Sequence, residues 1–334
     1  MKKIAVLGSG SWGTALAVHF GRLGYKVRLW GRDQILVSRM INEHINPTYL
    51  SDTLLPELVS PTASLDVAVK DTDYILVAVP SHGMRNVIRE LKPFLSERST
   101  IVSTAKGLEV GTLSRMSEII QQEISEFQPM AVLSGPSFAV EVARQQPTAV
   151  VVAGRNRDVV EAVQRDFRAD YLRLYGSEDV IGVEIGGALK NVIAIAAGVV
   201  EALDLGNNAL AAVITRGLAE ISRLTWAVGG RRETLSGLSG LGDLILTCTG
   251  RLSRNRHIGI ELGRGRSLKD ILMGMKMVAE GIRTTGAALK LADKHGIELP
   301  IAEQMAEVFD GRKDVRSVAE TLMVRRQRAE VDKD

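Results

Sequence analysis

Lys190 is the charged residue in a segment of otherwise small and apolar residues, an unusual place for an amine. The segment runs from Gly187 to Gly198, and helical spacing puts Lys190, Ala194 and Ala197 on one face. A lysine on such a face either extends to the surface or faces a cleft. In a cleft, burial beside another cation would lower its pKa, which suits proton transfer near neutral pH. Periodicity alone leaves both alternatives open.

Further candidates directly follow predicted strands, where ligands bind in open α/β sheets. Lys106 would project a cation toward this crevice, whereas an exposed lysine at a strand end is the ordinary alternative. Gly135 offers close approach of the backbone, and Ser137 offers a hydroxyl. The segments concerned are Val79-Pro80-Ser81, Ser103 to Glu109 and Ser134 to Ala139.

A Ser-Arg-Asn triplet in the second half of the chain could bind an anion. Ser253 can cap a helix that begins near Arg254, which leaves free amides and the positive end of the helix dipole for a phosphate. Arg254 would add a fork-shaped, charge-assisted contact, and Asn255 follows it. An ordinary helix cap is the alternative here. For Asp243, which follows Gly242, the alternative is a simple turn residue.

Near the N-terminus, Gly8-Ser9-Gly10-Ser11-Trp12-Gly13 has the G-x-G-x-x-G spacing that is typical of dinucleotide binding. It follows a predicted strand and begins a predicted helix. The first glycine makes the tight turn, the second lets the backbone approach a pyrophosphate, and the third allows close packing of helix and strand. A glycine-rich turn without a ligand is the alternative, and the strand–helix context argues against it.

The end of the second predicted strand, Val27 to Trp30, bears on the choice between NAD and NADP. An acid at this point holds the ribose hydroxyls of NAD, whereas an arginine can pair with the 2′-phosphate of NADP. Arg32 comes before Asp33 here, so we expect NADP to be accepted together with NAD. A solvated loop residue is the alternative for Arg32.

The elements that would position these residues indicate an α/β fold in the first half. Short apolar runs, several of them continuous rather than alternating, predict strands of a parallel sheet that is buried on both faces. Helical patterns between them, such as Trp12 to Leu23 and Gly83 to Leu91, indicate a doubly wound sheet of Rossmann type. The predicted strands are Ile4–Leu7, Val27–Trp30, Tyr74–Val79, Thr100–Ser103, Met130–Leu133, Ala149–Ala153 and Leu172–Tyr175.

Strand patterns stop after about Val180, and Ala/Leu/Ile-rich helical patterns follow. We therefore expect a dinucleotide-binding Rossmann domain at residues 1–180 and an all-helical, substrate-binding and catalytic domain at residues 181–334. No Ser/Gly/Pro-rich linker separates the two, which favours a tight cleft between them. The predicted helices span roughly 181–203, 208–229, 254–263, 281–294 and 300–310.

Composition excludes several other classes of protein. The 334 residues are 45% hydrophobic and 24% charged with a net charge of +3, an ordinary globular balance without the basic stripe of a nucleic-acid binder. A single cysteine, Cys248, and five scattered histidines predict neither an internal disulfide nor a metal site. The apolar run at the N-terminus stops at Gly8, too short for a secretory signal. We expect a cytoplasmic protein that binds a small molecule, without a membrane span.

Several longer motifs resemble, in order, those of bacterial NAD(P)-dependent glycerol-3-phosphate dehydrogenases. The resemblance extends from Lys3 to about residue 325, and it is far more specific than the glycine motif alone. It is carried by Ser103–Glu109, Gly135–Ala139, Gly187–Gly198, Gly237–Leu244 and Ser253–Asn255.

The resemblance implies roles for individual residues. Lys190 is similar to the family's catalytic lysine, which gives a proton to the carbonyl oxygen on reduction. Lys106 resembles a residue that contacts both cofactor and substrate, and Arg254 one that lies near both. The other implied substrate contacts are Gly135, Ser137, Asp243, Ser253 and Asn255. The resemblance also implies cofactor contacts at Ala139, Val278 and Glu280. Together with the glycine motif and the strand end, the expected cofactor contacts are Gly8, Gly10, Ser11, Trp12, Gly13, Arg32, Lys106, Ala139, Arg254, Val278 and Glu280.

The same resemblance implies interconversion of dihydroxyacetone phosphate and sn-glycerol 3-phosphate for phospholipid synthesis, and a homodimer. A β-hydroxyacid dehydrogenase of the 6-phosphogluconate type is a second possibility, since it shares the Rossmann half, the helical half and a lysine borne on a helix. The triplet at Ser253 and the segment around Gly135 argue against it. A dinucleotide sensor without activity is a third, but it would have no reason to keep both Lys106 and Lys190 at the cleft.

Overall fold

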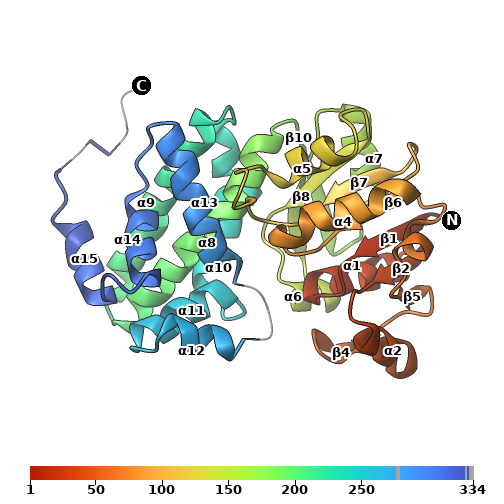
Figure 1. Cartoon of the computed structure of the whole chain (residues 1–334), viewed down its shortest axis with the longest axis horizontal. Helices are drawn as coiled ribbons and strands as arrows, with labels where there is room; N and C mark the ends of the chain where they lie inside the picture. The colour runs from red at the N-terminus through yellow and green to blue at the C-terminus, as the bar shows by residue number, and fades with distance from the viewer. Residues whose placement is uncertain (276–278, 328, 331–334) are drawn as a thin grey trace.

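The Val, Ile and Leu runs of the first 177 residues form an eight-stranded sheet in the order β10-β9-β8-β7-β6-β1-β2-β5. It lies beside a helical part that is formed by the described residues after 177 (Figure 1). The structure is a computed structural model, and it describes residues 1–275, 279–327 and 329–330. The fold is therefore the predicted Rossmann-type α/β sheet followed by helices.

All seven predicted strands are present, with ends that differ by at most two residues. They are β1 (Lys3–Leu7), β2 (Lys26–Trp30), β6 (Tyr74–Val77), β7 (Thr100–Ser103), β8 (Met130–Ser134), β9 (Thr148–Ala153) and β10 (Leu172–Ser177). The sequence prediction missed three further strands, which are β3 (Ile45–Asn46), β4 (Leu50–Leu54) and β5 (Val59–Thr62). β5 extends the sheet beyond β2, and β3 and β4 form a separate antiparallel pair.

The expectation of an entirely parallel sheet is wrong at one position, because β9 runs antiparallel to β8. The connection between them contains only the short helix α6 (Ala139–Ala143). Five residues of helix span about 7.5 Å, too little to carry the chain back along a strand. Moreover, α6 packs against α1 (Ser11–Arg22). The chain therefore re-enters the sheet from the edge at which it left.

Helices cover both faces of the sheet, which explains the continuous apolar runs of its strands. On one face, Leu16 and Phe20 of α1 and Phe167 of α7 (Arg157–Phe167) share a core with β1, β2 and β6. On the other face, α4 (Met84–Leu91) and α5 (Met116–Glu123) contribute Met84 and Ile119, for example, to a second core. This part also contains the helices α2 (Gln34–Glu43) and α3 (Leu65–Val69).

Helix α8 (Val180–Ala202) is the centre of the helical part (Figure 1). It is long and apolar enough to cross a membrane, but 94% of its most apolar window is buried inside the protein, as expected of a core helix. Helices α10, α11 and α13 pack directly against it. The helices that follow are α9 (Gly206–Ala227), α10 (Asp243–Thr249), α11 (Arg254–Gly263), α12 (Leu268–Met273), α13 (Glu280–Lys294), α14 (Pro300–Phe309) and α15 (Val315–Met323).

Glycines bring α8 and α11 unusually close together. A Cβ atom at Gly198 of α8 would overlap the carbonyl oxygen of Arg256, and one at Gly259 of α11 would overlap that of Ile195. The obstacles are backbone atoms, which cannot rotate away as a side chain would. The close approach of these two backbones therefore fixes the position of α11, whose N-terminus carries Ser253 and Arg254.

We predict that Gly198→Ala lowers the free energy of unfolding by about 1–3 kcal/mol through overpacking against Arg256. Gly286→Ala is the matched control, because Gly286 lies in α13 with nothing within 4 Å of an added Cβ. An exposed helical glycine changed to alanine should gain about 0.5–1 kcal/mol. Urea unfolding of the two variants and the parental protein measures both changes in the free energy of unfolding. Equal stability of Gly198→Ala and the parent protein would contradict the packing argument.

Candidate active site

Three charged side chains from separate elements meet where the carboxyl edge of the sheet faces α8. Lys106 follows β7, Lys190 lies in the middle of α8, and Asp243 is the first residue of α10. Lys106 Nζ donates to Asp243 Oδ2 at 2.6 Å and to the carbonyl oxygen of Gly135 at 3.1 Å. Lys190 Nζ donates to Asp243 Oδ1 and, at 2.9 Å, to Thr247 Oγ1. The two lysines thus share one carboxylate.

A glycine-rich segment delivers Asp243 to this position. Leu238 to Gly242 form one turn of π-helix immediately before α10. A Cβ atom at Gly240 would overlap the backbone of Leu235, so the turn packs more tightly than any other residue would allow. Turns of π-helix inside or beside α-helices are frequent at functional sites. The alternative that Asp243 is a plain turn residue is therefore excluded, because its side chain is buried and paired.

Burial and mutual interaction set the charge of this cluster. Only 7% of Lys190 and 1% of Asp243 is exposed. Burial, the largest cause, lowers the pKa of Lys190 to about 7, with Lys106 adding to the effect and Asp243 opposing it. Burial alone would raise the pKa of Asp243, but the two ammonium groups hold it below its usual value. Lys190 is therefore poised to gain or lose a proton near neutral pH.

The segment after β8 lies beside the lysines. Gly135 has φ of +125°, a conformation that favours glycine, and its carbonyl oxygen accepts hydrogen bonds from both Lys106 Nζ and, at 3.0 Å, Ser137 Oγ. Ser137 is partly exposed, and Ala139 begins α6. The carbonyl oxygen of Gly135 thus holds the Lys106 ammonium and the Ser137 hydroxyl beside each other.

The triplet Ser253-Arg254-Asn255 lies at the N-terminus of α11, where its sequence predicts it. Ser253 caps the helix by accepting a hydrogen bond from the Arg256 amide at 3.2 Å. Asn255 Oδ1 accepts from the amide of Gly281 at 3.3 Å, which ties this end to the start of α13. Arg254 is exposed, and its guanidinium interacts electrostatically with the carboxylate of Glu280. Among the described residues, no hydrogen bond links the triplet to Lys106, Lys190 or Asp243.

The glycine loop at the start of α1 fits a bound dinucleotide. Gly8 has φ of +118°, and a Cβ atom at Gly13 would overlap the carbonyl oxygen of Gly8. In contrast, a Cβ atom at Gly10 would meet nothing within 4 Å, so the backbone there is open to a ligand. Gly10 also caps α1 without a side chain, which leaves the first amides of the helix to an anion. Ser11 and Trp12 form the first turn, beside this opening.

The end of β2 separates the roles of its two charged residues. Asp33 caps α2, because its Oδ1 accepts hydrogen bonds from the amides of Ile35 at 2.9 Å and Leu36 at 3.1 Å. Its carboxylate is thus committed to the helix rather than to a ribose. Arg32 is exposed and makes no hydrogen bond or ion pair within the part of the chain that the structure describes. Arg32 is the free charge at this strand end.

Glu280 connects the helical part to the sheet across the expected cofactor crevice. Its carboxylate accepts hydrogen bonds from the Ser81 amide at 3.0 Å and from Ser81 Oγ at 2.5 Å. Ser81 follows β6 at the carboxyl edge of the sheet. Val278, the other expected cofactor contact in this segment, lies outside the described residues.

Comparison with known proteins matches both halves of the chain to one family of dehydrogenases. The family model described as NAD-dependent glycerol-3-phosphate dehydrogenase N-terminus matches residues 3–160, and the C-terminus model of the same description matches residues 179–320. The chain belongs to this family. A glycerol-3-phosphate dehydrogenase [NAD(P)+] of Koribacter versatilis is 48% identical over 99% of both chains, and one of Moorella thermoacetica is 48% identical over 99% and 98%.

Solved structures of the family show the same architecture. The glycerol-3-phosphate dehydrogenase of Coxiella burnetii has a TM-score of 0.94 at 40% identity, and the comparison covers 97% of this chain and 99% of that one. The enzyme GPD1 of Saccharomyces cerevisiae has a TM-score of 0.81 at 27% identity over 96% and 99%. Membership of this dehydrogenase family argues against the 6-phosphogluconate type considered from the sequence.

Two polar residues that contact predicted site residues escaped the sequence prediction. Thr247 accepts a hydrogen bond from Lys190 and donates to the carbonyl oxygen of Asp243 at 2.6 Å. Its position four residues after Asp243 on one helix was the signal available. Ser81, which bonds Glu280, was quoted only as part of a strand end, and no spacing rule connects it with a residue 199 positions away.

We predict that Asp243→Asn lowers the free energy of unfolding by about 3–5 kcal/mol at neutral pH, because it removes the anion from two lysines in a buried cluster. Asp52→Asn is the control, since the Asp52 side chain is 73% exposed and should change stability by at most about 0.5 kcal/mol. Chemical unfolding followed by circular dichroism measures both. A loss in Asp243→Asn no larger than that of the control would refute the assigned pairing.

Proposed function

We propose that this chain is an NAD(P)-dependent sn-glycerol-3-phosphate dehydrogenase, which reversibly reduces dihydroxyacetone phosphate to sn-glycerol 3-phosphate. The observation that carries the proposal is the pair of lysines on Asp243, in a chain that belongs to the dehydrogenase family throughout. The cofactor is NAD or NADP, and when bound it supplies or accepts the hydride. Gly8, Gly10 and Gly13 would hold its pyrophosphate at the start of α1.

Lys190 is the proposed catalytic residue. Its Nζ would donate a proton to the carbonyl oxygen during reduction and take it back from the hydroxyl during oxidation. A pKa of about 7 supports this role, because both protonation states are populated near neutral pH. Asp243 and Thr247 hold the amine in a fixed direction. Lys106 adds a second positive charge, which would stabilise the alkoxide as it forms.

The substrate phosphate would bind at the N-terminus of α11. Ser253 and Arg254 contribute the cap and the charge there, while Asn255 has its oxygen committed to Gly281 and its amide nitrogen available as a donor. Binding the phosphate away from the reacting carbon would orient the ketone toward the lysines. Gly135 and Ser137 would contact the same substrate, and Ala139, Arg254, Val278 and Glu280 the cofactor.

The wider setting is proposed on the same basis. We assign dinucleotide binding to residues 1–180 and substrate binding and catalysis to residues 181–334. We propose a cytoplasmic homodimer that supplies glycerol 3-phosphate for glycerophospholipid synthesis, a role supported by the family. A sensor without activity is the remaining alternative, and turnover of dihydroxyacetone phosphate with NADPH or NADH in a spectrophotometric assay would exclude it.

We predict that Lys190→Met lowers kcat for dihydroxyacetone phosphate by about 10²-fold or more, the loss expected for a proton-transfer residue. NADPH should still bind, because the proposed pyrophosphate site is the glycine loop, and the hydrogen bonds of Lys190 go to Asp243 and Thr247 instead. Lys290→Met is the control, since Lys290 lies on α13 and is exposed. Near-parental turnover of Lys190→Met would remove this residue from the chemistry.

A second prediction concerns Arg32, the free charge at the end of β2. Arg32→Ala should raise KM for NADPH by about tenfold and leave that for NADH nearly unchanged, because only NADPH carries the 2′-phosphate. Steady-state kinetics of the parental protein and the variant with both cofactors gives the change in each KM. Equal effects on the two cofactors would show that Arg32 does not discriminate between them.

A further inference from the structure

Residues 108–115 form a small hairpin directly after Lys106. Leu108 and Arg115 form an antiparallel bridge at its base, and the amide of Glu109 donates to the carbonyl oxygen of Ser114 at 3.0 Å. Lys106 is therefore only two residues from the base of the hairpin. Any movement of this hairpin would change the position of the Lys106 ammonium relative to Asp243.

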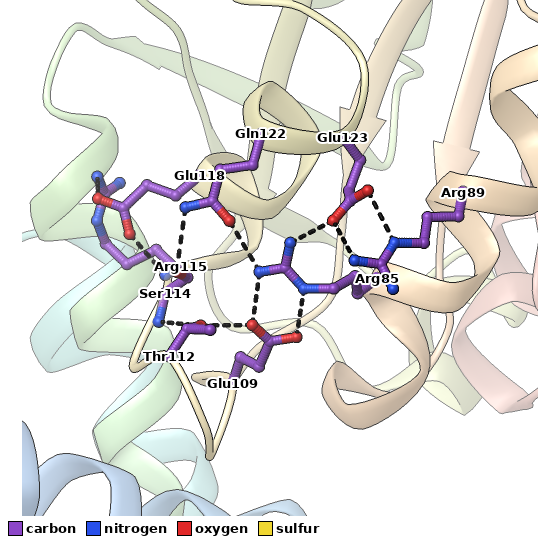
Figure 2. Close-up of polar contacts among 9 residues, drawn as sticks. All are labelled: Arg85, Arg89, Glu109, Thr112, Ser114, Arg115, Glu118, Gln122 and Glu123. Atoms are coloured by element: carbon purple, nitrogen blue, oxygen red, sulfur yellow. Dashed lines mark hydrogen bonds and ion pairs between the residues drawn. The ribbon is translucent and has the colours of Figure 1, made fainter.

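Charged contacts hold the hairpin to the sheet side of the molecule. Figure 2 shows Arg85 of α4 between the carboxylates of Glu109 and Glu123, with a fork of two bonds to Glu109 at 2.8 and 2.6 Å. Arg89 also bonds Glu123, at 2.8 and 3.0 Å, and thereby joins α4 to α5. This side of the hairpin is thus anchored to two helices that cover the sheet.

A buried ion pair holds the other side of the hairpin to α8. Arg115 donates to Glu184 Oε2 at 2.6 Å, and only 10% and 3% of the two side chains is exposed. Ser117 completes the contacts of the carboxylate, donating from its amide at 2.8 Å and from its hydroxyl at 2.6 Å. Leu108 at the base of the hairpin is buried in the apolar core of the helical part.

Glu184 and Lys190 lie on the same helix. Six residues separate them, about 9 Å along the axis. A helix is stiff over that length, so a group that fixes Glu184 also fixes Lys190. Arg115 therefore links the two lysines mechanically: Lys190 through Glu184 on α8, and Lys106 through the bridge to Leu108.

We propose that Glu184 is a positioning residue, which through Arg115 sets the spacing of Lys106 and Lys190 on Asp243. The proposal rests on the proposed dehydrogenase function. An apolar pair would fill the same space at no greater cost in stability. A buried ion pair at this place therefore indicates that the relative orientation of the hairpin and α8 must be fixed. The fork of Arg115 and the planar carboxylate of Glu184 provide that direction.

Loss of the pair has a predictable electrostatic consequence. If the hairpin withdraws, Lys106 moves away from Asp243, and its repulsion of Lys190 weakens. Because Lys106 lowers the pKa of Lys190 and Asp243 raises it, the pKa of Lys190 then rises. Cys248, which also lies near Lys190, is neutral, since burial raises its pKa to about 12. A role confined to stability would not move this pKa.

The test is Glu184→Gln, which keeps the shape and removes the charge. We expect kcat/KM for dihydroxyacetone phosphate to fall about tenfold, within the ~10²-fold that a 1 Å misplacement can cost. The pH midpoint of kcat for glycerol 3-phosphate oxidation, which requires neutral Lys190, should move upward. The dissociation constant of NADPH should stay at its parental value, which shows that the variant is folded.

Glu118→Gln is the matched control. Glu118 bonds the same arginine, through its guanidinium at 2.7 Å and its amide at 2.8 Å, but its side chain is 40% exposed and makes no hydrogen bond to a described residue of α8. We expect parental kinetics and an unchanged pH midpoint. A folded Glu184→Gln with the parental midpoint, or an equal shift in both variants, would overturn the proposal.

If Glu184→Gln does not fold, the double variant Arg115→Met/Glu184→Met decides, because an apolar pair can replace a buried ion pair without loss of stability. A raised midpoint in the double variant supports the proposal, and a parental one refutes it. Absence of turnover in the parental protein would instead refute the proposed function, so the two failures are distinguishable.

Discussion

Both oxygens of the buried Asp243 carboxylate are bonded to lysine ammonium groups, one from each half of the chain. Removing three charges from water is costly, and the arrangement persists only if the geometry of the pairs is good. The rest of the site depends on this constraint. The sheet must bring Lys106 to its carboxyl edge, α8 must place Lys190 opposite, and the π-turn must insert Asp243 between them.

The constraint also explains why the two halves of the molecule are joined by polar groups around an apolar core. Arg115 and Glu184 on one side and Ser81 and Glu280 on the other connect the sheet to the helical part. Both contacts are directional. They fix the position of the lysine cluster relative to the expected cofactor crevice. This agrees with catalysis by charged groups that are already in position when the substrate binds.

The sequence predicted the features that depend on local spacing. Gly8, Gly10 and Gly13 behave as the motif requires, and seven strands were found from continuous apolar runs. The direction of β9 could not be predicted in this way, because a strand covered on both faces has the same pattern whether it runs parallel or antiparallel. The strand pair β3 and β4 escaped as well, although Asn46 of β3 supports the glycine loop through a hydrogen bond to the Ser9 carbonyl oxygen at 2.8 Å.

The site residues also divide into those that local spacing indicates and those that depend on contacts far apart in the sequence. Lys190 and Lys106 were noticeable as single cations among small residues, whereas Asp243, their common partner 53 and 137 positions away, was indicated only by the family resemblance. The most direct test of the account is an NMR titration of ¹³Cε-labelled lysine in the parental protein, with the Lys190 signal assigned by its absence from Lys190→Met. The account predicts a midpoint near the pKa of about 7 expected for Lys190. A midpoint near the ordinary lysine value of 10.5 would contradict it.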